Sequence, residues 1–134
     1  MRRQGILHPQ ISRIISEMGH TDGLVVADAG LPIPKGVERV DLAFLPGVPS
    51  FLTVLDGILA ELSIEGALLA QEIQEANPTL WREVQSRLQV PIEYVPHQRF
   101  KERLPSVRAV IRTGECTPYA NVILFSSTQG IFPG

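Results

Sequence analysis

The sequence predicts a layered α/β/α fold with a largely parallel, mixed central sheet. Short apolar segments bounded by turn residues recur along the chain, as expected for strands that are buried on both faces. Amphipathic segments with helical spacing lie between them, and strands separated by helices favour parallel pairing. At 134 residues, the chain is expected to form one domain over residues 1–134.

The spacing of apolar residues predicts the first three elements. A helix is expected between Pro9 and Gly19, with an apolar face formed by Ile11, Ile14, Ile15 and Met18. The segment 23–27, GLVVA, is continuously apolar and predicts a buried strand. The segment 37–44 alternates between apolar and polar residues, which predicts a second strand with Val40, Leu42 and Phe44 on one side.

The second helix has the clearest pattern in the chain. Ser50 is suited to its N-cap, and its apolar stripe consists of Phe51, Val54, Leu55, Ile58, Leu59 and Leu62. The remaining predicted elements are strands at 66–70, 92–95, 108–112 and 121–125, a third helix, and a short helix at 98–104. In the third helix, Asn77 is expected to be the N-cap and Pro78 the first helical residue. The last two strands, joined by TGECTPYA, are where an antiparallel pairing is expected to enter the sheet.

Composition excludes several classes of protein. Twelve basic and fourteen acidic residues give a net charge of −2 without a basic stripe, so nucleic acid is not an expected partner. No apolar stretch has the length of a membrane span or a signal peptide, so no membrane partner is expected. The single cysteine, Cys116, excludes an intrachain disulfide and indicates a reducing compartment. We therefore expect a cytoplasmic protein.

Three polar residues lie where predicted strands meet loops, which is where ligand-binding groups gather in such sheets. His20 either caps the end of the first helix or acts as a general acid and base, for which imidazole is suited. Asp28 is either a turn residue or a carboxylate that accepts hydrogen bonds from a ligand. His97 either begins the short helix or contacts the same ligand.

The loop that precedes the last strand is rich in polar side chains, namely Glu115, Thr117, Tyr119 and Asn121. A phenol and an amide together supply donors and acceptors that suit a polyol. Cys116 lies among them without a neighbour in sequence that would activate a thiol, and we interpret it as incidental. Motifs for nucleotides, serine nucleophiles and zinc do not occur, so the sequence predicts proton transfer without a metal or cofactor.

Three segments resemble the D-ribose pyranase family, which includes RbsD and the fucose mutarotases. They are GILHPQISRIISEMGHTDGLVVADAGLPIP, VDLAFLPGVPSF and AVIRTGECTPYANVIL. The combination GHTD…DAGLP…TGE.TPYAN is more specific than its parts and resembles the ribose branch rather than the fucose branch. The resemblance implies an isomerase that interconverts the β-pyranose and β-furanose rings of D-ribose.

The resemblance also implies site residues and an assembly. His20 matches the position of the family's proton donor, and the substrate-binding positions match Asp28, His97, Tyr119, Ala120 and Asn121. Lys101 and Glu115 are polar residues that can assist. The family's ring-shaped homodecamers of two stacked pentamers imply a homo-oligomer with active sites near subunit boundaries.

The sequence is also compatible with three other hypotheses about function. The protein can be a mutarotase for another sugar such as fucose, a sugar-binding module without turnover, or a structural subunit of a ring. Exchange rates on ribose and fucose separate the first of these from a ribose enzyme. A binding module needs no titrating group at His20, and a structural subunit tolerates the loss of His20, Asp28 and Asn121 together.

Overall fold

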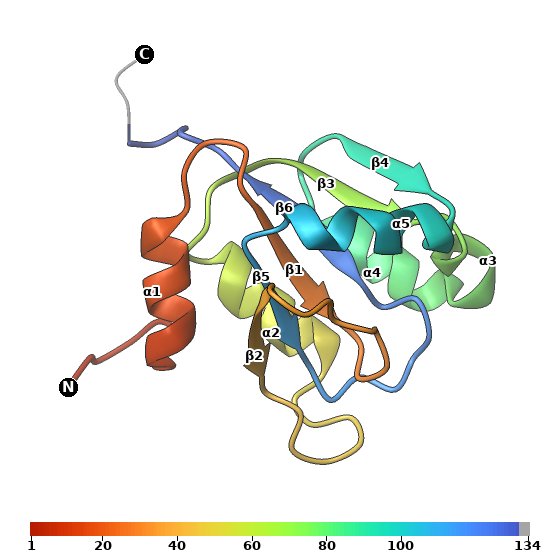
Figure 1. The fold of residues 1–134 in the computed structure, drawn as a ribbon, viewed down its shortest axis with the longest axis horizontal. Coiled ribbons are helices and arrows are strands. Elements are labelled where there is room, and N and C mark those ends of the chain that lie inside the picture. Colours follow the sequence, from red (N-terminus) through yellow and green to blue (C-terminus); the bar gives the residue numbers. More distant parts are fainter. Residues whose placement is uncertain (132–134) are drawn as a thin grey trace.

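The computed structural model describes residues 1–131, in which six strands form one mixed sheet in the order β2-β5-β1-β6-β3-β4 (Figure 1). Parallel pairs join β1 to β5, β2 to β5 and β3 to β4, whereas β6 is antiparallel to both β1 and β3. The strands are β1 Gly23–Ala27, β2 Glu38–Asp41, β3 Ile64–Ala70, β4 Ile92–Val95, β5 Ala109–Arg112 and β6 Val122–Ser126. The predicted fold class is confirmed.

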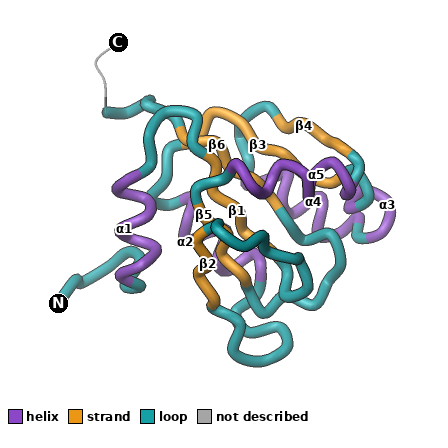
Figure 2. Tube along the Cα trace, in the orientation of Figure 1, coloured by secondary structure: helices purple, strands orange, loops and turns teal. Residues whose placement is uncertain are grey.

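Helices cover both faces of this sheet (Figure 2). One face packs against α1, α2 and α4, and the other packs against α5 and η1, which lie in front of the sheet in Figure 1. The helices are α1 Pro9–Glu17, α2 Phe51–Leu59, α3 Ile73–Ala76, α4 Pro78–Arg87, α5 His97–Arg103 and the 3₁₀ turn η1 Leu104–Ser106. None of the helices within residues 1–131 is both long enough and apolar enough to cross a bilayer.

Burial on both faces explains the continuously apolar strands. In β1, Leu24 and Val26 belong to the core on the α2 side, and Val25 and Ala27 belong to the core on the α5 side. All four side chains are fully buried, and each large one contributes about 1.5–3 kcal/mol by leaving water. The strands β3, β5 and β6 alternate in the same way between the two cores.

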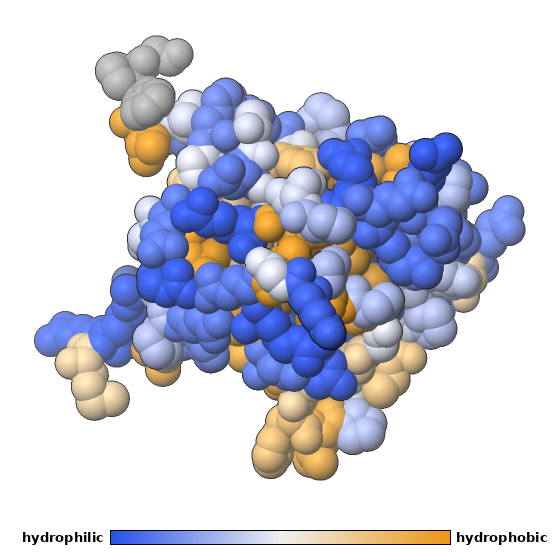
Figure 3. Space-filling view, in the orientation of Figure 1, coloured by the Kyte–Doolittle hydropathy of each residue, from blue (hydrophilic) through white to orange (hydrophobic). Residues whose placement is uncertain are grey.

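The loop after β2 differs from the prediction. The strand ends at Asp41, so it does not extend to Phe44, which is 78% exposed. The chain turns back instead through hydrogen bonds between the backbones of Leu45 and Val48. Phe44, Leu45 and Val48 form an exposed apolar loop, which protrudes at the lower end of the molecule (Figure 3).

Three further local features differ from what the sequence predicted. The side chain of Asn77 does not cap α4, because its amide donates to the carbonyl oxygen of Pro118. The short helix α3 was not predicted, and only one of its residues, Ile73, is buried. The antiparallel pairing does enter with β6, but its partners are β1 and β3 rather than β5.

Candidate active site

The direction of the strands brings most of the predicted site residues together. The strands β1 to β5 all point the same way, since β6 is antiparallel to both β1 and β3. The carboxyl ends of these strands and the start of β6 therefore share one edge of the sheet. Asp28 follows β1, His97 lies just after β4, and Asn121 precedes β6, so all three lie at this edge.

Asp28 is held by hydrogen bonds with Asn121, which precedes β6, and with Gly30 in its own turn. Its backbone N–H donates to Asn121 Oδ1 at 2.8 Å, and Asn121 Nδ2 donates to Asp28 Oδ2 at 3.0 Å. The Gly30 N–H donates to Asp28 Oδ1 at 2.9 Å, which closes the turn predicted for DAGLP. The carboxylate is thus fixed in one orientation where β1 ends.

The side chains of Ala120 and Asn121 face the interior. Both residues are fully buried, and Ala120 belongs to the core on the α2 side of the sheet. Neither residue lines the cavity described below. The amide of Asn121 contacts Asp28.

His97 begins α5 and carries a buried ring nitrogen. The His97 backbone N–H donates to both carboxylate oxygens of Glu72, at 2.9 and 3.0 Å, so Glu72 supplies the cap of this helix. The imidazole stacks on Phe100 and meets the ring of Tyr119 edge-on at 5.2 Å between centroids. Its Nδ1 atom is buried and has no hydrogen-bond partner within residues 1–131, an arrangement that a ligand hydroxyl can complete.

Burial and a nearby cation keep His97 neutral. Loss of solvent around the ring lowers the pKa of His97 below its ordinary value of 6.5, and the positive charge of Lys101 lowers it further. The carboxylates of Glu72 and Asp28 act in the opposite direction without reversing the shift. The ring is therefore uncharged at neutral pH. Lys101 acts on the cavity through its charge and does not line it.

Glu115 ties the polar loop to α2. Its Oε1 accepts the N–H of Phe51, the first residue of α2, at 2.9 Å, and its Oε2 accepts the Thr117 hydroxyl at 2.7 Å. The Ala29 N–H donates to the Glu115 carbonyl oxygen at 2.8 Å. Glu115 thus holds the loop against both the start of α2 and the turn that follows β1.

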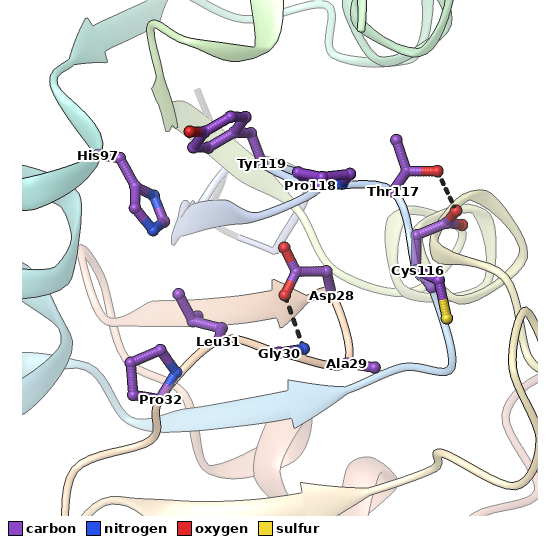
Figure 4. Close-up of a pocket in the computed structure, with 11 residues that line it drawn as sticks. Asp28, Ala29, Gly30, Leu31, Pro32, His97, Cys116, Thr117, Pro118 and Tyr119 are labelled. Atoms are coloured by element: carbon purple, nitrogen blue, oxygen red, sulfur yellow. Dashed lines mark hydrogen bonds between the residues drawn. The ribbon is translucent and has the colours of Figure 1, made fainter. Parts of the chain in front are cut away.

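These loops enclose an open cavity of about 530 Å³, within the usual range for a small-molecule site (Figure 4). Its lining consists of Asp28, Ala29, Gly30, Leu31, Pro32, His97, Glu115, Cys116, Thr117, Pro118 and Tyr119. The Asp28 carboxylate and the His97 ring both point into it in Figure 4. Leu31 and Pro32 were not expected in the site, although their position shortly after a buried strand was a usable signal.

His20 lies at the opposite edge of the sheet. It precedes β1, whereas Asp28 follows it, and the five residues of β1 separate its two ends by about 13 Å. The imidazole is half-exposed, with 54% of the side chain accessible, and its Nε2 lies 2.9 Å from Oε2 of Glu65 near the start of β3. Within one chain, His20 therefore does not share the cavity with Asp28, contrary to our expectation.

Strained backbone angles occur both beside His20 and in the lining of the cavity. Among residues 1–131, only two residues other than glycine have positive φ angles, namely Thr21 at 71° and Tyr119 at 67°. Such angles are unfavourable for bulky and β-branched residues and often accompany functional loops. Thr21 adjoins His20, and Tyr119 lines the cavity.

Within residues 1–131, the structure places no three His, Cys, Asp or Glu side chains together in a group suited to hold a metal ion.

Gly114 makes the packing of the polar loop possible. A Cβ atom on this residue would collide with the Val48 carbonyl oxygen and lie 2.7 Å from the Leu45 carbonyl oxygen. We expect Gly114→Ala to lower the free energy of unfolding by about 1–3 kcal/mol, because rigid backbone must move. Gly57→Ala is the matched control: its Cβ would meet nothing within 4 Å in α2, so we expect a gain of about 0.5–1 kcal/mol. Urea denaturation measures both changes, and equal midpoints would contradict this account of Gly114.

Comparison with known proteins places the chain in a family. A family model described as the RbsD / FucU transport protein family matches residues 1–129. The chain belongs to this family. A D-ribose pyranase from Laribacter hongkongensis is 53% identical to it over 127 residues, which cover 94% of this chain and 97% of that protein. Another from Geobacillus kaustophilus is 47% identical over 130 residues, which cover 96% of each.

Solved structures of the RbsD / FucU family have the same fold. The structure of Bacillus subtilis RbsD complexed with D-ribose matches with a TM-score of 0.92 at 40% identity, covering 95% of this chain and 98% of that one. A fucose mutarotase from Streptococcus pneumoniae, in complex with L-fucose, matches with a TM-score of 0.70 at 24% identity. That match covers 90% of this chain and 93% of the other, and shows a shared fold only.

Proposed function

We propose that the protein is a D-ribose pyranase, an isomerase that interconverts the β-pyranose and β-furanose rings of D-ribose. The observation that carries the proposal is the match, over 95% of the chain, to an RbsD structure that holds D-ribose. The cavity supports it, because a carboxylate, an imidazole and a phenol surround a space that suits a small polyol. The lower identity to the fucose-bound structure favours ribose over fucose.

The reaction consists of two proton transfers around each ring opening and closure. Opening the pyranose moves a proton off the anomeric hydroxyl and another onto the ring oxygen, which becomes the C5 hydroxyl of the open-chain aldehyde. Attack by the C4 hydroxyl on the aldehyde then closes the furanose and reverses both transfers. No electrons leave the sugar, so positioned acids and bases suffice and no cofactor is needed.

The cavity residues bind and orient the sugar in this proposal. Asp28 accepts hydrogen bonds from sugar hydroxyls, and the neutral His97 provides its buried Nδ1 as a partner. Tyr119 contributes its phenol. Ala120 and Asn121, the other two proposed substrate-binding residues, follow Tyr119 directly in the chain. Glu115 shapes the loop. Together they hold the open chain so that it closes in register.

His20 is the proposed proton donor and comes from a second copy of the chain. Its place at the far edge of the sheet supports this, because it is half-exposed and cannot reach Asp28 of its own chain. The exposed apolar loop of Phe44, Leu45 and Val48 supports contact between copies, since such surface is usually covered by a partner. We propose a homodecamer of two stacked pentameric rings that works in the cytoplasm, the compartment that a lone cysteine favours.

Saturation-transfer NMR on D-ribose tests the activity directly. The protein should accelerate exchange between pyranose and furanose signals well above the rate in buffer. L-fucose serves as the comparison sugar at equal concentration. Exchange on fucose but not on ribose would assign the protein to the other branch, and binding of ribose without faster exchange would leave a sugar-binding module.

The charge of Lys101 should set the pH range of ribose binding. Burial lowers the pKa of His97 most, and the Lys101 ammonium adds to this effect, so Lys101→Met should raise the pKa toward its ordinary value. A protonated His97 ring has no nitrogen left to accept a hydrogen bond from a sugar hydroxyl. Loss of ribose affinity on acidification should therefore begin at a higher pH in this variant. Imidazole proton shifts in NMR and calorimetry measure the two effects. Arg99→Met is the control, since Arg99 is an exposed cation of α5 that does not influence His97, and an unshifted titration in Lys101→Met would contradict the prediction.

A further inference from the structure

Arg112 joins the turn after β1 to the end of β2. It is the last residue of β5, and the register places it beside Ala27 of β1 and Asp41 of β2. Its Nε donates to the Ala29 carbonyl oxygen at 2.9 Å, and its Nη1 donates to both carboxylate oxygens of Asp41 at 3.1 Å. We propose that Arg112 is a positioning residue, which acts on the bound sugar through the turn that carries Asp28. This inference rests on the proposed sugar-binding function.

The turn after β1 forms one side of the cavity (Figure 4). Residues 28–32 all line the cavity, whereas Arg112 and Asp41 do not. A shift of the turn therefore moves the Asp28 carboxylate together with the backbone beside it. Any effect of Arg112 on the sugar has to pass through this segment.

The backbone of Ala29 is held from two directions. Its N–H donates to the Glu115 carbonyl oxygen at 2.8 Å, and the Arg112 side chain supplies the donor for its carbonyl oxygen. The next N–H, that of Gly30, closes the turn on Asp28 Oδ1. Residues in a turn lack the ladder bonds of a strand, so a side-chain donor such as this guanidinium limits their motion.

The guanidinium of Arg112 is itself fixed by Asp41. The Asp41 Oδ1 also accepts the Ala43 N–H at 3.1 Å, which holds the carboxylate where β2 ends. The side chains of Arg112 and Asp41 are 31% and 38% exposed, and ion pairs of this kind contribute little to the stability of a whole fold. We therefore expect the effect of Arg112 to be local to the turn.

Arg112→Lys separates the charge of this residue from its two contacts. A lysine ammonium is a single donor centre on a flexible stem, whereas the guanidinium donates from two separate nitrogens. The lysine should stay paired with Asp41 and leave the Ala29 carbonyl oxygen without its donor. Calorimetry should show a Kd for D-ribose that is raised by about tenfold. The melting temperature should fall by no more than about 4 °C. Native affinity for D-ribose in this variant would overturn the proposal.

Arg39→Met is the matched control. The Arg39 Nη1 lies 3.8 Å from Asp41 Oδ2, and within the described residues Arg39 makes no hydrogen bond to the turn after β1. Its removal takes a cation away from the same carboxylate and leaves the support of Ala29 intact. We expect its Kd for D-ribose to stay within about twofold of the native value. Equal losses of affinity in Arg39→Met and Arg112→Lys would overturn the proposal, because the charge near Asp41 would then be the cause.

Amide hydrogen exchange without sugar tests the support of the turn directly. In Arg112→Lys, the N–H groups of Ala29 and Gly30 should exchange at least about tenfold faster, because the turn that protects them opens more often. The amides of β1 and β6, at the centre of the sheet, should keep their native rates. Unchanged exchange at Ala29 and Gly30, or faster exchange throughout the sheet, would overturn the proposal.

A crystal of the unmodified protein with D-ribose gives a result that does not depend on the folding of any variant. An Arg112 guanidinium that contacts Ala29 and Asp41 and stays out of reach of the sugar supports the proposal. A guanidinium within hydrogen-bond distance of the sugar overturns it. Failure of the unmodified protein to bind D-ribose would instead refute the proposed function, whereas the exchange rates of Ala29 and Gly30 would still report on the turn.

Discussion

His20→Ala should lose ring exchange and keep its fold. A positioned acid and base contributes roughly 10²–10⁴-fold to such a reaction, and that factor should disappear from the saturation-transfer rate. Stability should change by no more than about 1 kcal/mol, because the ring is half-exposed and its contact is a hydrogen bond with the surface residue Glu65. Thermal unfolding of the same sample measures this second quantity.

His8→Ala is the matched control and should show the opposite result. The His8 Nδ1 accepts the Ile11 N–H at 3.3 Å and caps α1, so its removal should cost about 0.5–2 kcal/mol of stability. Exchange of ribose should continue, since His8 contacts no cavity residue. Undiminished exchange in His20→Ala would contradict the role of His20 as proton donor.

Mixing two inactive variants should restore activity. Asp28→Ala removes the carboxylate from one side of the proposed shared site, and His20→Ala removes the imidazole from the other. If subunits of both kinds are unfolded, mixed in equal amounts and refolded, about a quarter of the sites should combine an intact His20 with an intact Asp28. The exchange rate should then rise from near zero to about a quarter of the native value.

The controls for this experiment are the two variants refolded separately, which should stay inactive. A mixture that stays inactive, although size-exclusion chromatography shows mixed oligomers, would contradict a site shared between copies. It would also require a different proton donor near Asp28, because His20 lies at the other end of β1 in its own chain.

Local patterns predicted the elements because burial acts on each strand directly. The apolar segment of β1 is buried on both faces, and this alone distinguishes it from a surface strand. The prediction that the second strand extends to Phe44 was wrong, because an alternating pattern cannot reveal that the chain turns back at Leu45. The pairing of strands depends on residues far apart in the chain. The place of β6 between β1 and β3 therefore could not be predicted from local sequence patterns.

The candidate site was predictable where it depends only on the common direction of parallel strands. Asp28 and His97 follow parallel strands, so their convergence is a general property of such sheets. His20 was grouped with them because it also adjoins a strand, but it adjoins the opposite end. The contacts of Asn121 depend on the register of β6 with β1, and no pattern along the chain encodes that register.

The position of β6 also bears on how the molecule is made. The sixth strand in chain order lies at the centre of the sheet, between the β2-β5-β1 half and the β3-β4 half. Until residues 122–126 emerge from the ribosome, β1 and β3 each present an unpaired edge to the surrounding solvent. A nascent polypeptide that stalls before residue 122 is thus exposed to edge-to-edge aggregation, and chaperones have their greatest opportunity to act before β6 emerges.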